Sequence, residues 1–325
     1  MPEPRQPRSL RVLLVGEESA GVQTLNAVAR TVHEVVAVMT SARPAAPTAS
    51  LSAVAARLGI PVWSAALVQD KEFAEEIRAA GVDLILNVHS LHLICNEVIR
   101  AARIGAFNMH PGPLPEYAGL NTVSWGIYNG ETTFGVTVHW LAPKIDAGDI
   151  AYESTFTIEE ADTPLRVMHN CVSRGIPLIL QLLETAALDP AAIPREPQDL
   201  SRRRYFGRQP PEQGRLSWRR KASEIVNFIR ACNYAPYDSP WGHPITMSCH
   251  RQIAIIDAAR TERPSTTAPG TIRACDEPGV LVSAIDEWVS VRQVEVDGWR
   301  GDPKSVLKAG DVLTETPRAR VRYGC

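Results

Sequence analysis

The sequence predicts a protein of the α/β class, in which an open, mostly parallel sheet is followed by a small antiparallel β-barrel. Short apolar runs of strand length alternate with helical patterns through the first half of the chain, which is typical of a parallel sheet covered by helices. Towards the C-terminus, strand-like runs follow one another and are separated by Gly, Pro and Asp. A chain of 325 residues is long enough to bury two such cores. We therefore predict a first domain at 1–187, a linker at 188–204 and a second domain at 205–325.

The first domain begins with an alternation of strands and helices. Apolar runs of strand length predict strands, and apolar residues three or four positions apart predict helices. The predicted strands are 11–16, 34–40, 82–88, 105–110 and 134–141, and the predicted helices are 22–31, 51–59 and 71–81. Open parallel sheets bind ligands beyond the carboxyl ends of their strands, so the site is expected in the loops that follow the last three of these strands.

The first turn argues against a nicotinamide-dependent enzyme. Gly16 and Gly21 stand five positions apart, and the segment lacks the three-glycine fingerprint that cradles a dinucleotide. The second strand does not end in an acidic residue either, which would be needed to bind the ribose of such a cofactor.

The rest of the chain predicts a helix, a linker and the barrel. The helix spans 158–186, begins near Asp162, Thr163 and Pro164, and is expected to kink or break at Pro177. Within the Pro- and Asp-containing linker region, Arg202 to Arg204 are interpreted as a solvated run. Another helix is expected within 224–237, and the barrel strands are expected at 245–250, 251–259, 270–275, 279–285 and 287–296.

Three polar side chains stand out at the ends of two predicted strands. Asn108 and His110 alternate in the strand 105–110, so they share one face where that strand ends. Asp146 lies in the Gly- and Asp-containing turn after the strand 134–141. Each taken alone is usually an ordinary turn residue, but their joint spacing favours a common site. An amide, an imidazole and a carboxylate together suit acyl transfer.

The surrounding motifs resemble those of the formyltransferases that use 10-formyltetrahydrofolate. The shared pieces are Asn-X-His at 108–110, Leu-Pro-X-Tyr-X-Gly at 114–119 and Asp-X-Gly-Asp-Ile at 146–150, with SWGIYNGE between the last two. Upstream, HLICNEVI at 92–99 is similar to the formyl-transferring part of the enzyme that modifies aminoarabinose on lipid A. The resemblance implies a Rossmann-like catalytic domain and an OB-like C-terminal domain.

The resemblance also implies a mechanism. An amine attacks the formyl carbon carried by the folate, and negative charge develops on the former carbonyl oxygen. Asn108 and His110 would stabilise that charge, at about 3 kcal/mol per donor. Asp146 would favour the imidazolium form of His110 and help to accept the amine proton. The sequence leaves open which group takes this proton.

Substrate-binding residues follow from the same resemblance. The acceptor pocket is a hypothesis: Tyr117, Asn121 and Trp125 would shape it, because the arginine that many relatives carry after this loop's Leu-Pro segment is absent here. Backbone-rich loops that offer an apolar slot suit a flat pterin ring. The predicted folate-binding residues are His92, Leu93, Ile94, Leu120, Ala142, Pro143, Lys144, Ile145 and Asp146; His89 and His139 are interpreted as structural.

The composition of the chain limits the binding partners and the cellular location that we expect. A formal net charge of −2 gives no general attraction to nucleic acid or anionic membrane, although tRNA stays open as an acceptor. The N-terminal segment lacks the apolar core of a secretion signal, and no unbroken apolar run of membrane-spanning length is apparent. Six cysteines show neither a disulfide framework nor close metal-ligand spacing, so a cytoplasmic location without a metal is expected. The oligomeric state stays open, with a homodimer as the candidate.

Four functions are compatible with these observations. The leading hypothesis is an N-formyltransferase that acts on a small-molecule amine, either a nucleotide-linked amino sugar or an intermediate of natural-product biosynthesis. Methionyl-tRNA is the alternative acceptor, but the segment TSARPAAPTASLS lacks the Lys-rich insertion of that subfamily. Hydrolysis of formyltetrahydrofolate needs only water in place of the amine. A folate-binding module without activity has no need of Asn108, His110 and Asp146 together.

Overall fold

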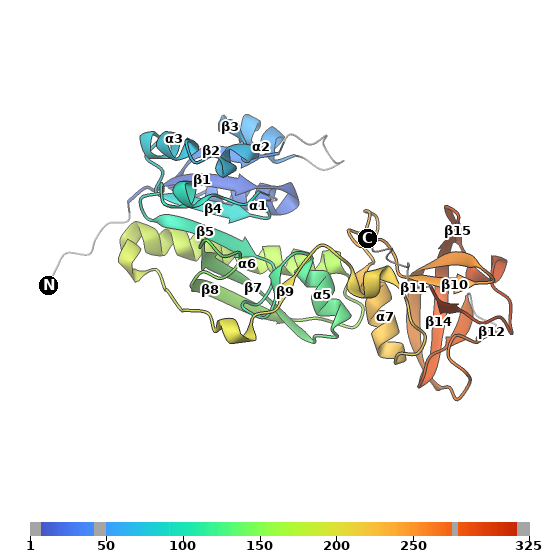
Figure 1. Cartoon of the computed structure of the whole chain (residues 1–325). Helices are drawn as coiled ribbons and strands as arrows, with labels where there is room; N and C mark the ends of the chain where they lie inside the picture. Colours follow the sequence, from blue (N-terminus) through green and yellow to red (C-terminus); the bar gives the residue numbers. More distant parts are fainter. Residues whose placement is uncertain (1–7, 42–49, 91, 275–278, 317–325) are drawn as a thin grey trace, which may run out of the picture. The chain divides into compact units, whose positions relative to one another are not determined.

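The computed structural model describes residues 8–41, 50–90, 92–274 and 279–316 of the chain (Figure 1). The N-terminal segment, the middle of TSARPAAPTASLS, Cys275 and Cys325 fall outside the described residues. The chain forms two compact units that interleave along the sequence. The domain boundaries expected from the sequence stay a prediction. Unit 1 comprises Met1–Gly119, Thr133–Thr157 and Met168–Tyr205, and unit 2 comprises Leu120–Thr132, Ile158–Val167 and Phe206–Cys325.

Unit 1 contains the predicted open sheet. Its pairs are parallel from β3 to β5, and the last two pairs are antiparallel, so the sheet is mostly parallel as predicted. The inner strands read as continuous apolar runs because both faces of the sheet are buried. The strands, in sheet order, are β3 (Val62–Ser64), β2 (Glu34–Thr40), β1 (Arg11–Gly16), β4 (Leu84–Val88), β5 (Gly105–His110), β7 (Thr133–Trp140) and β8 (Ile150–Thr157).

Helices follow the parallel strands and bury their apolar side chains against the sheet. Ser50 caps the second helix by accepting a hydrogen bond from the Ala53 N–H, which satisfies one free donor of its first turn. Leu13 and Val15 of β1 lie in one core cluster with Phe73 and Ile77 of the third helix. These elements are α1 (Glu18–Val28), α2 (Leu51–Arg57), the 3-10 helix η1 (Ala65–Gln69), α3 (Phe73–Ala79) and α4 (Asn96–Ile99).

The long helix α6 (Pro164–Leu188) corrects one expectation. The predicted break at Pro177 is wrong, because the helix runs through this residue as one element. Side chains on both sides of the proline, such as Cys171 and Leu182, are fully buried, so tertiary packing outweighs the local cost of the proline ring. Within the described ranges, α6 alone has the length and apolar composition that a membrane span would need. The apolar side chains on the buried side of α6 pack in the core, which accounts for that composition.

The segment predicted as a linker packs against unit 1. Glu196 pairs with Ile150 at the start of β8, and the Trp140 indole N–H donates to the Pro194 carbonyl. The Arg195 guanidinium lies 3.5 Å from the centre of the Trp140 ring. Short 3-10 turns, η2 (Pro190–Ala192) and η3 (Leu200–Arg202), interrupt this segment, which continues into β9 (Tyr205–Phe206) and runs beside β6 (Ala118–Gly119). We call residues 193–204 the strap.

Unit 2 contains a curled antiparallel sheet, consistent with the predicted OB-like domain (Figure 1). The helix α7 (Ala222–Ala231) packs against α5 (Thr122–Tyr128) and β11 of the sheet. Arg230 ties α7 to the 158–163 turn by donating to three carbonyl oxygens, those of Glu159, Glu160 and Asp162. The sheet order is β12 (Ile272–Ala274), β13 (Val280–Ser283), β14 (Glu287–Val296), β11 (Arg251–Pro264), β10 (Ile245–Ser248) and β16 (Thr314–Glu315), with β15 (Trp299–Gly301) on β14; the 3-10 turns are η4 (Pro211–Gly214) and η5 (Pro303–Ser305).

The close approach of α6 to the sheet depends on Gly175. A Cβ at this position would overlap Met109 Sδ of β5 and lie 3.1 Å from a Val136 methyl of β7. Gly175→Val is therefore expected to destabilise the protein by about 1–3 kcal/mol through overpacking, measured by urea unfolding. Gln181→Ala, at an exposed position of the same helix, is the control and should change the stability little. Equal stability of the two variants would contradict this packing.

Candidate active site

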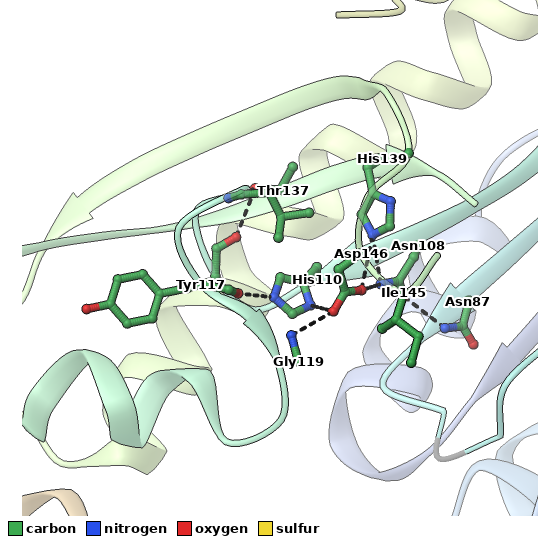
Figure 2. Close-up of polar contacts among 12 residues, drawn as sticks. Asn87, Asn108, His110, Tyr117, Gly119, Thr137, His139, Ile145 and Asp146 are labelled. Carbon is green, nitrogen blue, oxygen red and sulfur yellow. Dashed lines mark hydrogen bonds and ion pairs between the residues drawn. The ribbon is translucent and has the colours of Figure 1, made fainter. Parts of the chain in front are cut away.

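Polar side chains form a row across the carboxyl end of β4, the end of β5 and the facing part of β7. In the strand register, Asn108 is the partner of both Asn87 and His139, while His110 is the partner of Thr137. Because paired residues in a sheet point to the same face, these side chains gather above one surface (Figure 2). The Asn87 amide donates to Asn108 Oδ1 at 2.8 Å. The predicted alternation of Asn108 and His110 is therefore part of a wider polar row.

The hairpin loop between β7 and β8 brings Asp146 to this row. The Asp146 carboxylate accepts the Gly119 N–H at 2.8 Å and lies 3.7 Å from His110 Nδ1 and 3.6 Å from His139 Nε2. Asp146 has a φ of +50°, and a Cβ on Gly148 would overlap the Trp140 carbonyl oxygen. The loop is thus closed tightly enough to point a charged side chain inward, where its side chain is only 9% exposed. Asn108, His110 and Asp146 converge as the sequence predicted.

The hydrogen bonds of His110 define which of its ring nitrogens carries a proton. Its Nε2 lies 2.6 Å from the Tyr117 carbonyl oxygen, which can only accept a hydrogen bond. Nε2 therefore carries the proton of the neutral ring, and Nδ1 presents its lone pair on the side of Asp146. His110 is held as a base whose free nitrogen faces a carboxylate.

His139, interpreted from the sequence as structural, belongs to the same cluster. Its Nδ1 donates to the Trp140 carbonyl oxygen at 2.9 Å, which leaves Nε2 to accept from Asn108 Nδ2 at 3.1 Å. The other contact of Asn108 Nδ2 is with Asp146 Oδ1, at 3.5 Å. The antiparallel pairing of β5 and β7, which the sequence does not reveal, puts His139 opposite Asn108.

Burial and charge set the protonation of the cluster. Burial raises the pKa of Asp146, but the imidazoles of His110 and His139 in their protonated forms and the Gly119 N–H outweigh it, so the pKa lies well below the usual range. Burial lowers the pKa of His110, and this exceeds the opposing effects of Asp146 and the Tyr117 carbonyl. Asp146 favours the imidazolium form, as expected, but the resting His110 is neutral because burial dominates.

The strap supports the Asp146 loop from outside. Gln198 Nε2 donates to the carbonyl oxygens of Asp146 and Gly148, at 3.2 and 2.7 Å. The Arg203 guanidinium donates to the Ile145 carbonyl at 2.9 Å. Arg203 was interpreted from the sequence as part of a solvated run. No spacing in the sequence connects residues 198 and 203 with a loop fifty positions upstream, so only the fold reveals this support.

The predicted folate-binding residues lie in loops, all of them in unit 1 except Leu120, and their role stays a prediction. His92 Nε2 contacts Ser41 Oγ at 3.2 Å, and Ile94 packs against the core of unit 1. Leu93 is 62% exposed and Ile145 is 36% exposed, both on unit 1. Leu120, which belongs to unit 2, is 40% exposed, and Ala142, Pro143, Lys144 and Ile145 lie in the β7–β8 hairpin loop that ends at Asp146.

The three residues expected to shape the acceptor pocket belong to both units and also stay a prediction. Tyr117 is buried in unit 1 and packs edge-on against Phe134. Asn121 precedes α5 in unit 2 with a φ of +54°. Trp125 stacks on Phe206 within unit 2 at a centroid distance of 4.8 Å. In the part of the chain that the structure describes, no three His, Cys, Asp or Glu side chains are grouped as metal ligands.

Comparison with known proteins connects this geometry to a family. A family model described as formyl transferase matches residues 9–181, and another described as the formyl transferase C-terminal domain matches residues 209–306. Together these matches cover both parts of the fold.

Solved structures share the fold at low sequence identity. The N-formyltransferase from Helicobacter canadensis, solved with folinic acid and dTDP-3-aminofucose, has a TM-score of 0.66 at 20% identity, covering 87% of this chain and 99% of that one. WlaRD, a sugar 3N-formyltransferase solved with dTDP and 5-N-formyl-THF, has a TM-score of 0.67 at 18% identity, covering 88% and 98%. HypX from Aquifex aeolicus, solved with tetrahydrofolic acid, has a TM-score of 0.57 at 17% identity, covering 89% and 45%.

The low pKa of Asp146 predicts a pH-dependent contribution to stability. A carboxyl group whose folded pKa is depressed stabilises the protein above its unfolded pKa, and this stabilisation is lost as pH falls through the folded pKa. The stability difference between the wild type and Asp146→Asn should therefore be full at pH 7 and shrink below about pH 4. Urea unfolding of both proteins from pH 7 to pH 3 measures it. A difference that stays constant over this range would show that Asp146 titrates normally.

Proposed function

Because the chain belongs to the formyl transferase family, we propose that it transfers a formyl group from 10-formyltetrahydrofolate to a primary amine of a small molecule. The proposed acceptors are a nucleotide-linked amino sugar or an intermediate of natural-product biosynthesis. One observation carries this proposal: Asn108, the neutral base His110 and the ionised Asp146 meet in a buried cluster at the carboxyl end of the sheet. A protein that only binds folate has no need of this combination.

Exposed apolar side chains on loops of unit 1 support folate as the formyl donor. Leu93 follows β4 and Ile145 directly precedes Asp146, and both are large apolar side chains that are exposed. A flat heteroaromatic ring needs such an apolar slot with a few fixed donors and acceptors. The structures with folinic acid, 5-N-formyl-THF and tetrahydrofolic acid are of proteins that share this fold. The folate supplies the activated formyl group, and the protein supplies orientation and charge.

His110 is assigned as the group that takes the amine proton. Its Nδ1 has a free lone pair, since Nε2–H is held by the Tyr117 carbonyl. Protonation places a positive charge 3.7 Å from the Asp146 carboxylate, an attraction on the order of 4 kcal/mol at the effective dielectric of a partly buried pair. The resting pKa of His110 is low, but Asp146 stabilises its protonated form. The ring can therefore accept a proton during the reaction.

Asn108 is assigned as the donor to the formyl oxygen when it becomes negative. Its orientation is fixed, because Asn87 holds Oδ1 and His139 accepts from Nδ2. The contact of Nδ2 with Asp146 is long, at 3.5 Å, so this N–H is available to a stronger acceptor. A preorganised donor of this kind contributes about 3 kcal/mol to the transition state.

A small acceptor is favoured over methionyl-tRNA. The net charge of −2 provides no general attraction for a polyanion. Sugar N-formyltransferases, including one solved with dTDP-3-aminofucose, are among the proteins of similar fold over nearly the whole chain. These observations support an amino sugar, and the choice among small amines is left to experiment.

The test is release of tetrahydrofolate from 10-formyltetrahydrofolate by the purified protein. The reaction is run without an acceptor, and then separately with dTDP-linked amino sugars, amino acids and methionyl-tRNA. Release that depends on one small amine is the expected result. Release that needs no amine would indicate a hydrolase, and release with methionyl-tRNA alone would replace the proposed acceptor. Binding of folinic acid without release in any reaction would leave a binding module.

The assigned roles predict the behaviour of two variants. His110→Ala and Asp146→Ala should each lower kcat by about two orders of magnitude or more, because both groups act mainly in the transition state. The Kd of the His110→Ala variant for folinic acid, measured by calorimetry, should change little. His169→Ala, at an exposed position of α6, is the control and should keep normal turnover. Near-normal kcat in either active-site variant would contradict this mechanism.

A further inference from the structure

Two buried polar atoms at the end of β4 have no hydrogen-bond partner among the described residues. They are Oδ1 of Asn87, the residue before the last in the strand, and Nε2 of His89, which follows directly after the strand. Buried polar groups in folded proteins are nearly always paired, so an unpaired one calls for an explanation. Two such atoms two positions apart, beside the residues that we assign to catalysis, indicate a ligand rather than a packing defect.

The chemistry of Asn87 Oδ1 follows from a chain of hydrogen bonds. The ionised Asp146 carboxylate only accepts, so Asn108 must direct its NH2 group at it. Asn108 therefore offers Oδ1 to its neighbour, and Asn87 must use its own NH2 group for that bond. Asn87 Oδ1 is left as an acceptor, and its missing partner must be an N–H or O–H donor.

His89 is held in an unusual conformation beside the same site. Its backbone has a φ of +55°, a left-handed conformation that L residues rarely adopt and that is found preferentially at functional sites. Burial and, to a lesser extent, the charge of a protonated His110 together lower the pKa of His89 to about 4. A neutral imidazole can present one nitrogen as an acceptor. His89 thus adds an uncharged acceptor next to Asn87.

We propose that Asn87 and His89 form, together with His110, the subsite that holds the ammonium group of the acceptor next to the formyl carbon. Asn87 Oδ1, His89 Nε2 and His110 Nδ1 would each accept one of the three N–H groups of a protonated primary amine. The N–H bond directed at His110 breaks, its proton bonds to Nδ1, and the lone pair of the neutral amine attacks the formyl carbon. The bond from that carbon to the folate nitrogen then breaks as this nitrogen takes the proton back from His110, and the new amide nitrogen loses its second proton to solvent. This inference rests on the proposed formyl transfer and assigns the residues that select an amine.

Alternative roles of the pair predict different results. Asn87 also positions Asn108, and that role alone would lower kcat without a change in the KM of the amine. A purely structural role would lower the thermal stability of the variants. A role in folate binding would weaken the binding of folinic acid. Loss of a subsite for the amine raises the KM of the amine and leaves the thermal stability and the binding of folinic acid near their wild-type values.

The experiment uses Asn87→Ala and His89→Asn in the full-length protein. Asparagine tolerates the left-handed conformation, so His89→Asn removes the ring without forcing the backbone. Asn96→Ala and His169→Asn make the same replacements at exposed positions of unit 1 and serve as matched controls. Measured are the Tm, the Kd for folinic acid, and the release of tetrahydrofolate as a function of dTDP-3-aminofucose or hydroxylamine concentration.

We expect each variant to raise the KM of the amine by about tenfold or more, as for loss of a hydrogen bond to a charged group, with Tm and folinic acid binding retained. An unchanged KM would overturn the proposal, and weaker folinic acid binding with an unchanged KM would assign the pair to the folate instead. Failure of the wild type to release tetrahydrofolate with either nucleophile would overturn the proposed formyl transfer, and this subsite with it. That failure is visible before any variant is made.

Discussion

The buried carboxylate of Asp146 is the constraint on which the rest of this site depends. A charge that is removed from water is tolerated only when it is paired and hydrogen-bonded, and Asp146 meets the Gly119 N–H, the Asn108 amide and two imidazoles. Each of these partners is in turn oriented by another group. Because the carboxylate can only accept hydrogen bonds, it determines which way the Asn108 and Asn87 amides point.

The fold provides this arrangement through elements that are distant in the sequence. Strands β4, β5 and β7 bring their polar residues into one row, and the switch from parallel to antiparallel pairing at β7 adds a hairpin whose loop carries Asp146. The strap holds the same loop from outside through Gln198 and Arg203. A site built on paired strands and a braced loop is rigid, as charge stabilisation in a transition state requires.

The uncharged rings of His110 and His89 are consistent with the proposed chemistry. Burial keeps His110 uncharged although Asp146 lies 3.7 Å away, so the ring is ready to accept a proton and the carboxylate stabilises the product of that step. The same burial keeps His89 neutral. A site lined by uncharged acceptors around one carboxylate suits a cationic amine and discriminates against an anion.

The sequence by itself determined five strands of the first sheet, the main helices and the choice of Asn108, His110 and Asp146 as candidate site residues, because apolar periodicity and the spacing of these residues are local properties of the chain. It also determined the family, through motifs that two family models match. Only the tertiary structure decided that His139 and Asn87 join the cluster, since strand register is a long-range property. Tertiary packing likewise kept α6 continuous at Pro177 and packed the expected linker, as the strap, against the loop that carries Asp146. In both places, contacts between distant segments outweigh local preference.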